Sequence, residues 1–348
     1  MNKGSIIKNF PLRKRYVRTV LILFVLGAGI YLIISHGKNI SQVLHLLDKV
    51  SMSRFVISIV AEILSMMAFA RLQRRLLWSG GVKLKLLAMA EITFAGNALG
   101  AALPGGAVWS ATWSFGQLRR QGIKRSTVIW ALLLSGILST SILILIISIG
   151  ILIAGSRGPL AGVRSFVIGL LALIVTFVLA IKIFGNSGKV KKIKERYLQP
   201  SKNANHQSQT PKNTLNALLR EIGAIHSSSS GWLRAWLFAL ANWLFDAACL
   251  ATSIWALHAN VPWRGFLAIY GLTQIAASLP ITPGGLGVVE ASLAALLTAY
   301  GMPATMSLAV TVLYRSISFW ALQPIGWGTW IFIELSERFK KRRQIINE

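Results

Sequence analysis

The chain has 348 residues, of which 54% are hydrophobic and only 14% are charged. Water-soluble domains carry about a quarter charged residues, so this composition excludes a disordered chain and argues against an ordinary soluble enzyme. A single cysteine, Cys249, lies in an apolar run, which excludes a secreted scaffold built on disulfides. The formal net charge of +27 would suit a nucleic-acid binder, and the positions of the basic residues therefore decide what it means.

Apolar stretches of about 20 residues are long enough to cross a bilayer. Such stretches predict six membrane-spanning helices, at residues 17–35, 54–77, 127–153, 162–184, 232–257 and 305–333. Two more apolar stretches, 86–118 and 265–300, are interrupted by Gly, Pro and polar residues. We therefore expect an all-α polytopic membrane protein that forms one integral membrane domain over residues 1–348.

The basic residues follow the rule that cytoplasmic flanks of membrane helices are rich in Lys and Arg. They gather at residues 3–18, 71–85, 119–125, 182–234 and 338–343. Placing these clusters in the cytoplasm accounts for 30 of the 37 Lys and Arg, and leaves six in other loops and Arg315 inside a span. This predicts a bacterial inner-membrane protein with both termini cytoplasmic and anionic headgroups nearby. No nucleic-acid partner is expected, because outside the apolar runs no basic stretch is interleaved with stacking aromatic residues.

Two segments show whether the sequence predicts a cleaved signal peptide or a soluble domain. Residues 17–35 are too long for the apolar core of a signal peptide and lack a cleavage site after Ile34, so we interpret them as a retained anchor. Residues 185–230 are polar, contain the serine run 227–230, and have too few apolar side chains to bury a core. They are expected to form a flexible cytoplasmic loop, and no catalytic soluble domain is predicted.

An internal repeat relates residues 54–153 to residues 232–333 at an offset of 179 positions. The offset aligns Pro104-Gly105-Gly106 with Pro283-Gly284-Gly285, and Gly122 with Gly301. A Pro-Gly-Gly sequence arises easily by chance, but here each copy lies inside a broken apolar stretch and is followed by a Gly and a long span. The repeat therefore predicts four recurring elements: a span, a broken segment, a Gly step and a span.

The charge pattern gives the two copies opposite directions. In the first copy, 86–118 has basic clusters at both ends, which predicts a re-entrant hairpin that turns at Pro104-Gly105-Gly106. In the second copy, 265–300 is expected to enter from the other side and turn at Pro283-Gly284-Gly285. Inverted repeats with a Gly/Pro-interrupted segment in each half point to a transport site where the repeats meet.

Ionisable residues inside apolar stretches usually face the protein interior and pair. Glu290 is expected in the first turn of a half-helix, where the helix dipole favours a carboxylate, and its expected partner is Arg315, the one basic residue well inside the membrane. Two interpretations of this pair stay open. It either locks the second hairpin to the last span, or Arg315 binds a lipid phosphate and Glu290 holds Arg315 between substrates.

Three other carboxylates have two open interpretations, as proton-relay residues or as structural hydrogen-bond partners: Glu91, Asp246 and Glu62. Asn97, just before the first break, either caps loose backbone or binds a ligand. No cofactor and no metal site are expected, since the five histidines lack metal-ligand spacing. An intramembrane enzyme is disfavoured because no nucleophile–base or metal constellation is evident.

The segment Pro280–Ala291, followed by Tyr314-Arg315, resembles the signature of the lysylphosphatidylglycerol synthase transmembrane-region family. The segment Asn97–Gly106 is similar to that family's first Leu-Pro block, but Ala107-Val108 stands where the family commonly has Gly-Glu. The resemblance covers about residues 15–335. It implies a flippase-like membrane domain, here without the family's aminoacyl-transferring soluble domain, so lysine transfer is not expected.

These observations predict a protein, not an enzyme, that moves a lipid with an anionic headgroup, either a phospholipid or a lipid-linked group. The expected substrate-binding residues are Arg315, Glu290, Gly284, Gly285, Gly287, Pro283, Pro104, Gly105, Gly106 and Asn97. The alternative is a non-transporting partner that positions a separate lipid- or glycan-modifying enzyme. A homo-oligomer or a membrane enzyme partner is compatible with both.

Overall fold

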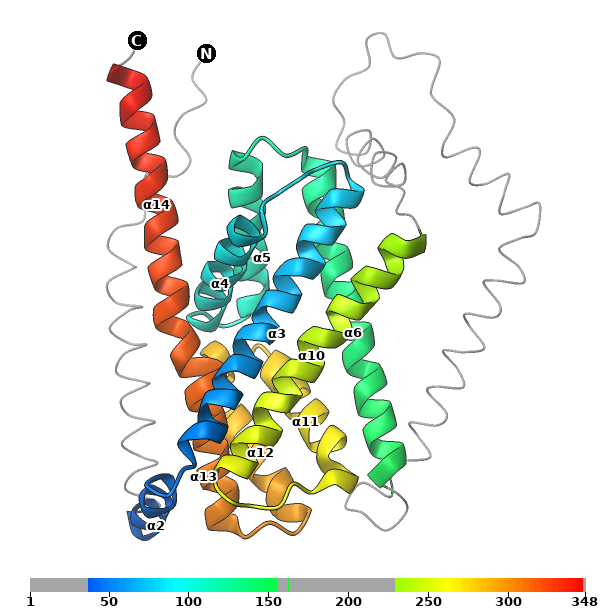
Figure 1. The fold of residues 1–348 in the computed structure, drawn as a ribbon, viewed down its shortest axis with the longest axis vertical. Helices are drawn as coiled ribbons and strands as arrows, with labels where there is room; N and C mark the ends of the chain where they lie inside the picture. Colours follow the sequence, from blue (N-terminus) through cyan, green and yellow to red (C-terminus); the bar gives the residue numbers. More distant parts are fainter. Residues whose placement is uncertain (1–36, 155–161, 163–228, 347–348) are drawn as a thin grey trace, which may run out of the picture. The chain divides into compact units, whose positions relative to one another are not determined.

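The computed structural model describes residues 37–154, residue 162 and residues 229–346. Every regular element in this part of the chain is a helix, and none is a strand (Figure 1). The prediction of an all-α polytopic membrane protein is therefore confirmed. The predicted spans at 17–35 and 162–184 and the predicted loop at 185–230 fall outside the described residues, apart from their edges.

By its internal contacts the chain divides into two units, residues 1–49 and 50–348. In the first unit the described residues form one helix, α2 (Gly37–Leu47). The second unit holds all other described elements and both copies of the repeat. Whether residues 1–348 act as one domain stays a prediction.

Within the described residues, four helical stretches are long and apolar enough to cross a membrane. Three of them are single helices, α3 (Met52–Ser79), α6 (Arg125–Ala154) and α10 (Ser229–Ala256). Their ends lie within three residues of the predicted spans. A helix of 28 residues is about 42 Å long, which exceeds the hydrocarbon core of about 30 Å, so each can span it with a turn to spare.

The fourth long stretch is a helix in three parts. It consists of α13 (Ala304–Arg315), a π-helical segment η2 (Ser316–Ala321) and α14 (Leu322–Ile346). The helix continues well beyond the predicted end at residue 333, because hydropathy marks where the apolar stretch stops and a polar tail can stay helical. π-Helical turns inside α-helices are frequent at functional sites, and this one begins directly after Arg315.

Both predicted broken segments form helical hairpins. The first consists of α4 (Leu86–Ala101) and α5 (Gly106–Arg120). The second consists of α11 (Trp263–Ser278), a short 3₁₀ turn η1 (Pro283–Gly285) and α12 (Val288–Ala299). A helix of 16 residues is about 24 Å long, shorter than the hydrocarbon core. Each hairpin therefore enters the span region and turns back within it.

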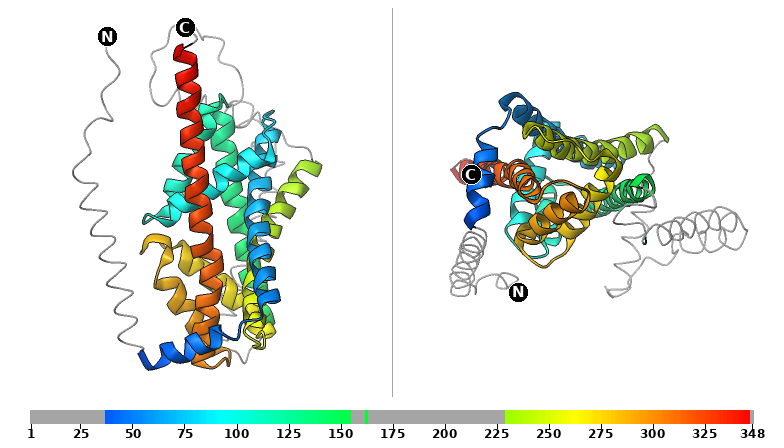
Figure 2. Two further views of the ribbon diagram at one scale, coloured as in Figure 1. Left: turned by 60° about the vertical axis from the view of Figure 1, so that its left-hand side comes forward. Right: turned by 90° about the horizontal axis from the view of Figure 1, so that it is seen from below.

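The two copies run in opposite directions, as predicted. In Figure 1, α3 rises while its counterpart α10 descends, and the two lie side by side. The tip of the α4–α5 hairpin points down and the tip of the α11–α12 hairpin points up, and the second view in Figure 2 shows the same arrangement. The two tips meet near the middle of the long helices.

Each hairpin packs against the last span of the other copy. A Cβ atom on Gly326 of α14 would lie 2.5 Å from the carbonyl oxygen of Phe94 in α4. A Cβ atom on Gly150 of α6 would lie 2.4 Å from the backbone nitrogen of Ala268 in α11. Small residues at such crossings let helix backbones approach closely, which is how helices associate where lipid removes the hydrophobic driving force. Because each hairpin packs against the last span of the other copy, both tips lie at a similar height along the long helices.

The central helices α3 and α10 are joined by buried polar contacts. The Ser58 hydroxyl donates to Thr252 Oγ1 at 2.8 Å, and the Ser65 hydroxyl donates to the carbonyl oxygen of Asn242 at 2.9 Å. Interhelical hydrogen bonds from serine and threonine stabilise membrane helix pairs. These two hydrogen bonds fix the register of α3 against α10. They therefore also fix how the side chains that the two helices contribute to the site line up with each other.

Candidate functional site

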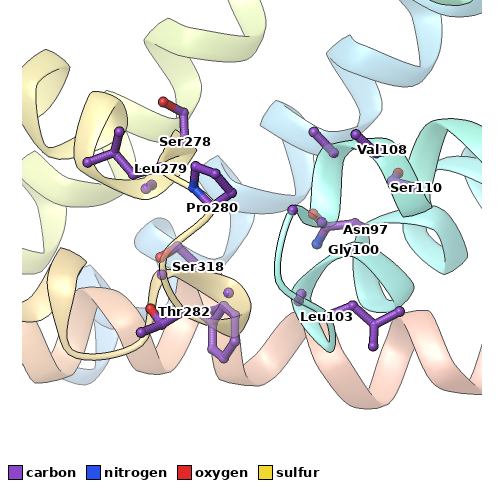
Figure 3. Close-up of a pocket in the computed structure, with 18 of the residues that line it drawn as sticks. Asn97, Gly100, Leu103, Val108, Ser110, Ser278, Leu279, Pro280, Thr282 and Ser318 are labelled. Atoms are coloured by element: carbon purple, nitrogen blue, oxygen red, sulfur yellow. The ribbon is translucent and has the colours of Figure 1, made fainter.

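A groove of about 550 Å³ lies between the two hairpin tips. Figure 3 shows Ser278, Leu279, Pro280 and Thr282 of the second hairpin on one side of the groove, and residues of the first hairpin on the other. The residues that line the first-hairpin side include Asn97, Gly100, Leu103, Gly105, Gly106, Val108 and Ser110. Arg315, Ser318 and Phe319, from α13 and η2, complete the lining. The broken segments of both copies therefore build one cavity.

The first-hairpin wall is made by close backbone packing. A Cβ atom on Gly106 would lie 2.0 Å from the carbonyl oxygen of Gly100, and one on Gly96 would lie 3.0 Å from the Ser110 and Ser114 hydroxyl oxygens. Small residues four positions apart on both helices thus bring α4 and α5 into direct contact. The result is a narrow hairpin with uncharged side chains at its tip.

The second tip depends on glycine at positive φ. Gly284 has φ 60° and Gly285 has φ 68°, a region that L-residues with a Cβ atom avoid. The Thr282 hydroxyl donates to the carbonyl oxygen of Leu286 at 2.9 Å and closes the turn. A Cβ atom on Gly284 would meet the Phe319 ring at 2.3 Å and the carbonyl oxygen of Ala101 at 3.1 Å. The two tips therefore touch at this glycine.

Arg315 holds the second tip to the last span. Its Nε atom donates to Glu290 Oε1 at 2.7 Å, and its Nη2 atom donates to the carbonyl oxygen of Gly284 at 3.0 Å. The guanidinium lies 4.3 Å from the centre of the Phe319 ring, within cation–π distance. Arg315 is only 8% exposed, but it borders the groove. These bonds use two of the five guanidinium N–H groups, so others remain for a ligand.

Glu290 connects two parts of the second hairpin. Its Oε1 atom accepts from Arg315, and its Oε2 atom accepts from the backbone N–H of Gly287 at 2.7 Å. Gly287 directly precedes α12, so the carboxylate caps the first turn, where the helix dipole favours a negative charge. The predicted ion pair is present. Glu290 is the structural link between the break and Arg315.

A second, smaller cavity lies behind the groove. This chamber has a volume of about 190 Å³ and is lined by polar side chains from α3, α4, α10, α11 and α13. It shares four lining residues with the groove, namely Asn97, Ala277, Arg315 and Ser318. The two cavities are therefore neighbours with Arg315 on their common wall.

Asp246 of α10 is surrounded by hydrogen-bond donors in the chamber. The Tyr314 hydroxyl donates to its Oδ1 atom at 2.7 Å, and the Tyr270 hydroxyl donates to its Oδ2 atom at 2.8 Å. The Gln274 amide also donates to Oδ2 at 2.8 Å. Three donors satisfy a carboxylate that would otherwise be costly to bury. This network links α10 to α11 and α13.

Glu62 of α3 faces the same chamber in a different environment. Its carboxyl group lies beside that of Asp246 and beside the Cys249 thiol. It is only 5% exposed, and no hydrogen-bond partner among the described residues reaches its Oε2 atom. The chamber thus contains one carboxyl group with three donors and one whose outer oxygen has none.

The structure brings most of the predicted site residues together. Asn97, Gly105, Gly106, Gly284, Gly285 and Arg315 line the groove. Pro104, Pro283 and Gly287 lie in the breaks and Glu290 lies in the first turn of α12, and none of the four lines the groove. Asp246 and Glu62 line the chamber, whereas Glu91 lines neither cavity. Substrate binding by these residues stays a prediction.

Several residues of the site were not predicted from the sequence. They are Tyr270, Gln274 and Tyr314 around Asp246, Asn242 in the chamber, and Ser318 and Phe319 beside Arg315. One available signal was the spacing of Tyr270 and Gln274, two polar groups four residues apart on one face of an apolar helix, and another was the presence of Tyr314 in the signature. Their common partner is 24 or more residues away in the chain, so the sequence did not identify it.

The sequence was compared with known proteins. The sequence model of a family described as "Lysylphosphatidylglycerol synthase TM region" matches residues 19–326, which is most of the chain. The chain is also 27% identical over 90 residues to a "UPF0104 membrane protein" of Methanothermobacter thermautotrophicus (strain Delta H). That match covers 26% of this chain and 27% of the relative, so it spans about a quarter of each protein.

Proposed function

The chain belongs to the lysylphosphatidylglycerol synthase TM-region family, and on this premise we propose that it moves a lipid with an anionic headgroup across the membrane. It is a multi-pass membrane protein of a family concerned with lipid handling. More specifically, we propose that it is a flippase-like transporter and not itself an enzyme. The observation that carries it is Arg315, a buried cation with spare N–H groups on the wall of a groove between two inverted hairpins.

The groove suits a polar headgroup. Its volume of about 550 Å³ falls in the range of small-molecule sites, about 300–1,000 Å³. A planar guanidinium recognises phosphate through parallel N–H bonds, and the hydroxyl groups of Ser110 in the first copy and Ser318 in the second add neutral donors to the lining. A phosphate-containing headgroup therefore has a charged anchor and polar contacts from both copies.

The surroundings of the groove suit acyl chains. Val108 on the first hairpin is 69% exposed, and Ile281 on the second is 62% exposed. Exposed apolar side chains beside a polar cavity can remain in contact with lipid while the headgroup enters the protein. In the proposed function, the headgroup crosses through the groove and the acyl chains stay in the hydrocarbon phase.

The proposed location is a bacterial inner membrane with both termini in the cytoplasm. Three segments rich in Lys or Arg support this orientation: the α3–α4 loop with Lys83 and Lys85, the α5–α6 loop with Lys124, and the end of α14. All three lie at the same end of the second unit in Figure 1. A common basic face is what the positive-inside rule predicts for the cytoplasmic side.

The first test is Arg315→Ala in proteoliposomes that contain a trace of acyl-labelled fluorescent phosphatidylglycerol. We expect at least a tenfold slower exchange of the label between leaflets, measured by bleaching the outer leaflet with dithionite. Arg264→Ala is the matched control, because Arg264 is exposed at the start of α11 and lies outside both cavities. Equal retention volumes in gel filtration would establish that both variants fold.

Normal exchange by folded Arg315→Ala protein would contradict the role assigned to Arg315. The alternative function, a non-transporting partner of a lipid- or glycan-modifying enzyme, makes a different prediction. In that case the purified wild-type protein alone would leave the label in place, and an enzyme would co-purify with it from its native membrane.

A further inference from the structure

The two carboxyl groups of the chamber differ in their hydrogen-bond donors. Asp246 accepts from Tyr270, Gln274 and Tyr314, and these donors stabilise its negative charge. Glu62 is more than nine-tenths buried, and in the described structure its Oε2 atom has no donor although it borders a cavity. An unpaired buried carboxylate beside another is costly, so Glu62 needs an added partner and Asp246 does not.

The Glu62 carboxylate is better suited to bind a proton than a metal ion. The lone pairs of Asp246 already point at three donors, so they are poorly placed to ligate a cation. No group of three or more His, Cys, Asp or Glu side chains with metal-binding geometry occurs among the described residues. Protonation of Glu62 removes one of two adjacent negative charges and lets its carboxyl group donate to the Asp246 carboxylate beside it.

The charged and titratable groups around Glu62 come from three other helices. They are Asp246 and Cys249 of α10, Tyr270 of α11, and Tyr314 and Arg315 of α13. Arg315 is the one cation among them, and it is already paired with Glu290. An anionic headgroup that binds Arg315 from the groove adds negative charge beside the chamber. The bound anion therefore makes an ionised Glu62 less favourable and a protonated Glu62 more favourable.

We propose that Glu62 is a proton-binding site that couples headgroup movement to proton movement, and this inference rests on the proposed function. Water in the groove delivers the proton, because groove and chamber share the wall formed by Asn97, Arg315 and Ser318. The proton is added to the Glu62 carboxylate when the headgroup binds and returns to water when it leaves. By reciprocity, protonation of Glu62 strengthens headgroup binding by the same factor. One anion and one proton then travel together.

The test uses the labelled phosphatidylglycerol in proteoliposomes whose lumen is about one pH unit more alkaline than the outside. One proton per lipid allows up to about tenfold accumulation per pH unit, since one unit corresponds to a factor of ten. We expect wild-type protein to accumulate the label in the inner leaflet by several-fold. The direction does not depend on how the protein is oriented in the vesicle.

Glu62→Gln is the diagnostic variant, because Gln keeps the size of the side chain and cannot ionise. We expect it to leave the label evenly distributed under the same gradient. Glu91→Gln is the matched control, since Glu91 is a half-buried glutamate in α4 that lines neither cavity, and this variant should accumulate the label as wild type does. Accumulation by folded Glu62→Gln protein would overturn the inference. Accumulation driven by a sodium gradient at equal pH would also overturn it.

A second measurement separates this inference from the proposed function. Short-chain dihexanoyl phosphatidylglycerol is added to detergent-solubilised protein in weak buffer with a pH indicator. We expect an uptake of up to one proton per wild-type protein and none for Glu62→Gln. Proton uptake without any lipid exchange would support the proton site and contradict the transporter. Lipid exchange without proton uptake or accumulation would support the transporter and overturn the proton site.

Discussion

The two hairpins occupy equivalent places in an inverted repeat, yet they are built in different ways. The first is closed by direct backbone contact between Gly100 and Gly106. The second has a longer break, in which Gly285 and Gly287 also have positive φ, and an ion pair between Glu290 and Arg315. At the offset of the repeat, neither Glu290 nor Arg315 has an ionisable counterpart, since Ala111 and Gly136 stand there.

This difference shows that the two copies of an inverted repeat can have different roles. The shared backbone chemistry, a Pro-Gly-Gly break in each copy, places both tips at the same depth. The Glu290–Arg315 pair occurs in the second copy alone, so the first hairpin lines the groove with uncharged residues and the second copy supplies the anion-binding group. Substitutions at matched positions in the two hairpins should therefore have unequal effects.

The largest effect is expected from Gly106→Val in the first hairpin. Any side chain at this position overlaps the carbonyl of Gly100, so α4 and α5 must separate. Overpacking of this kind costs about 1–3 kcal/mol, and we expect a clear drop in the melting temperature in detergent together with loss of lipid exchange. Gly116→Val on the same helix is the control, because a Cβ atom there meets nothing within 4 Å. Equal melting temperatures for the two variants would refute the close-packed wall.

A smaller effect is expected from Gly284→Ala in the second tip. The left-handed conformation costs an L-residue about 1–2 kcal/mol, and the new methyl group would also displace the Phe319 ring that lies against Arg315. Gly105→Ala is the matched change in the first tip, with φ 69° but nothing within 4 Å of its Cβ atom. We expect both to lower the melting temperature and only Gly284→Ala to slow lipid exchange. The reverse order would show that the tips do not meet at Gly284.

The smallest of these effects is expected from Glu290→Gln. Gln can still accept from Arg315, but a hydrogen bond between charged groups is stronger than one with a neutral acceptor by about 1 kcal/mol. We expect a modest drop in the melting temperature that persists in high salt, because salt screens a pair with a buried arginine only weakly. Glu334→Gln is the control, because Glu334 lies 3.8 Å from exposed Arg338 and surface pairs contribute little. A larger loss for Glu334→Gln would show that the second tip does not depend on its charge.

Part of the candidate site was accessible from the sequence. The Glu290–Arg315 pair was predicted from two features, a carboxylate just after a break and a lone arginine inside a span. The contact of the two breaks followed from the repeat and the charge pattern. The network around Asp246 was not predicted, because Tyr270 is an ordinary residue in an apolar helix, Tyr314 was noted only as part of a signature, and their shared partner lies on a third helix. Nothing local distinguishes such a tyrosine from one in the lipid interface.

The sequence by itself determined which stretches are long and apolar enough to span a membrane, where the chain breaks, and that the two copies run in opposite directions. Those properties depend on local composition, on glycine and proline backbone chemistry, and on the placement of basic residues. Only the tertiary structure decided that Glu62 lies beside Asp246, and that Arg315 stands between their chamber and the groove. Such pairings depend on how α3, α10, α11 and α13 pack together, and helix rotation and register in that packing follow from contacts between residues far apart in the chain.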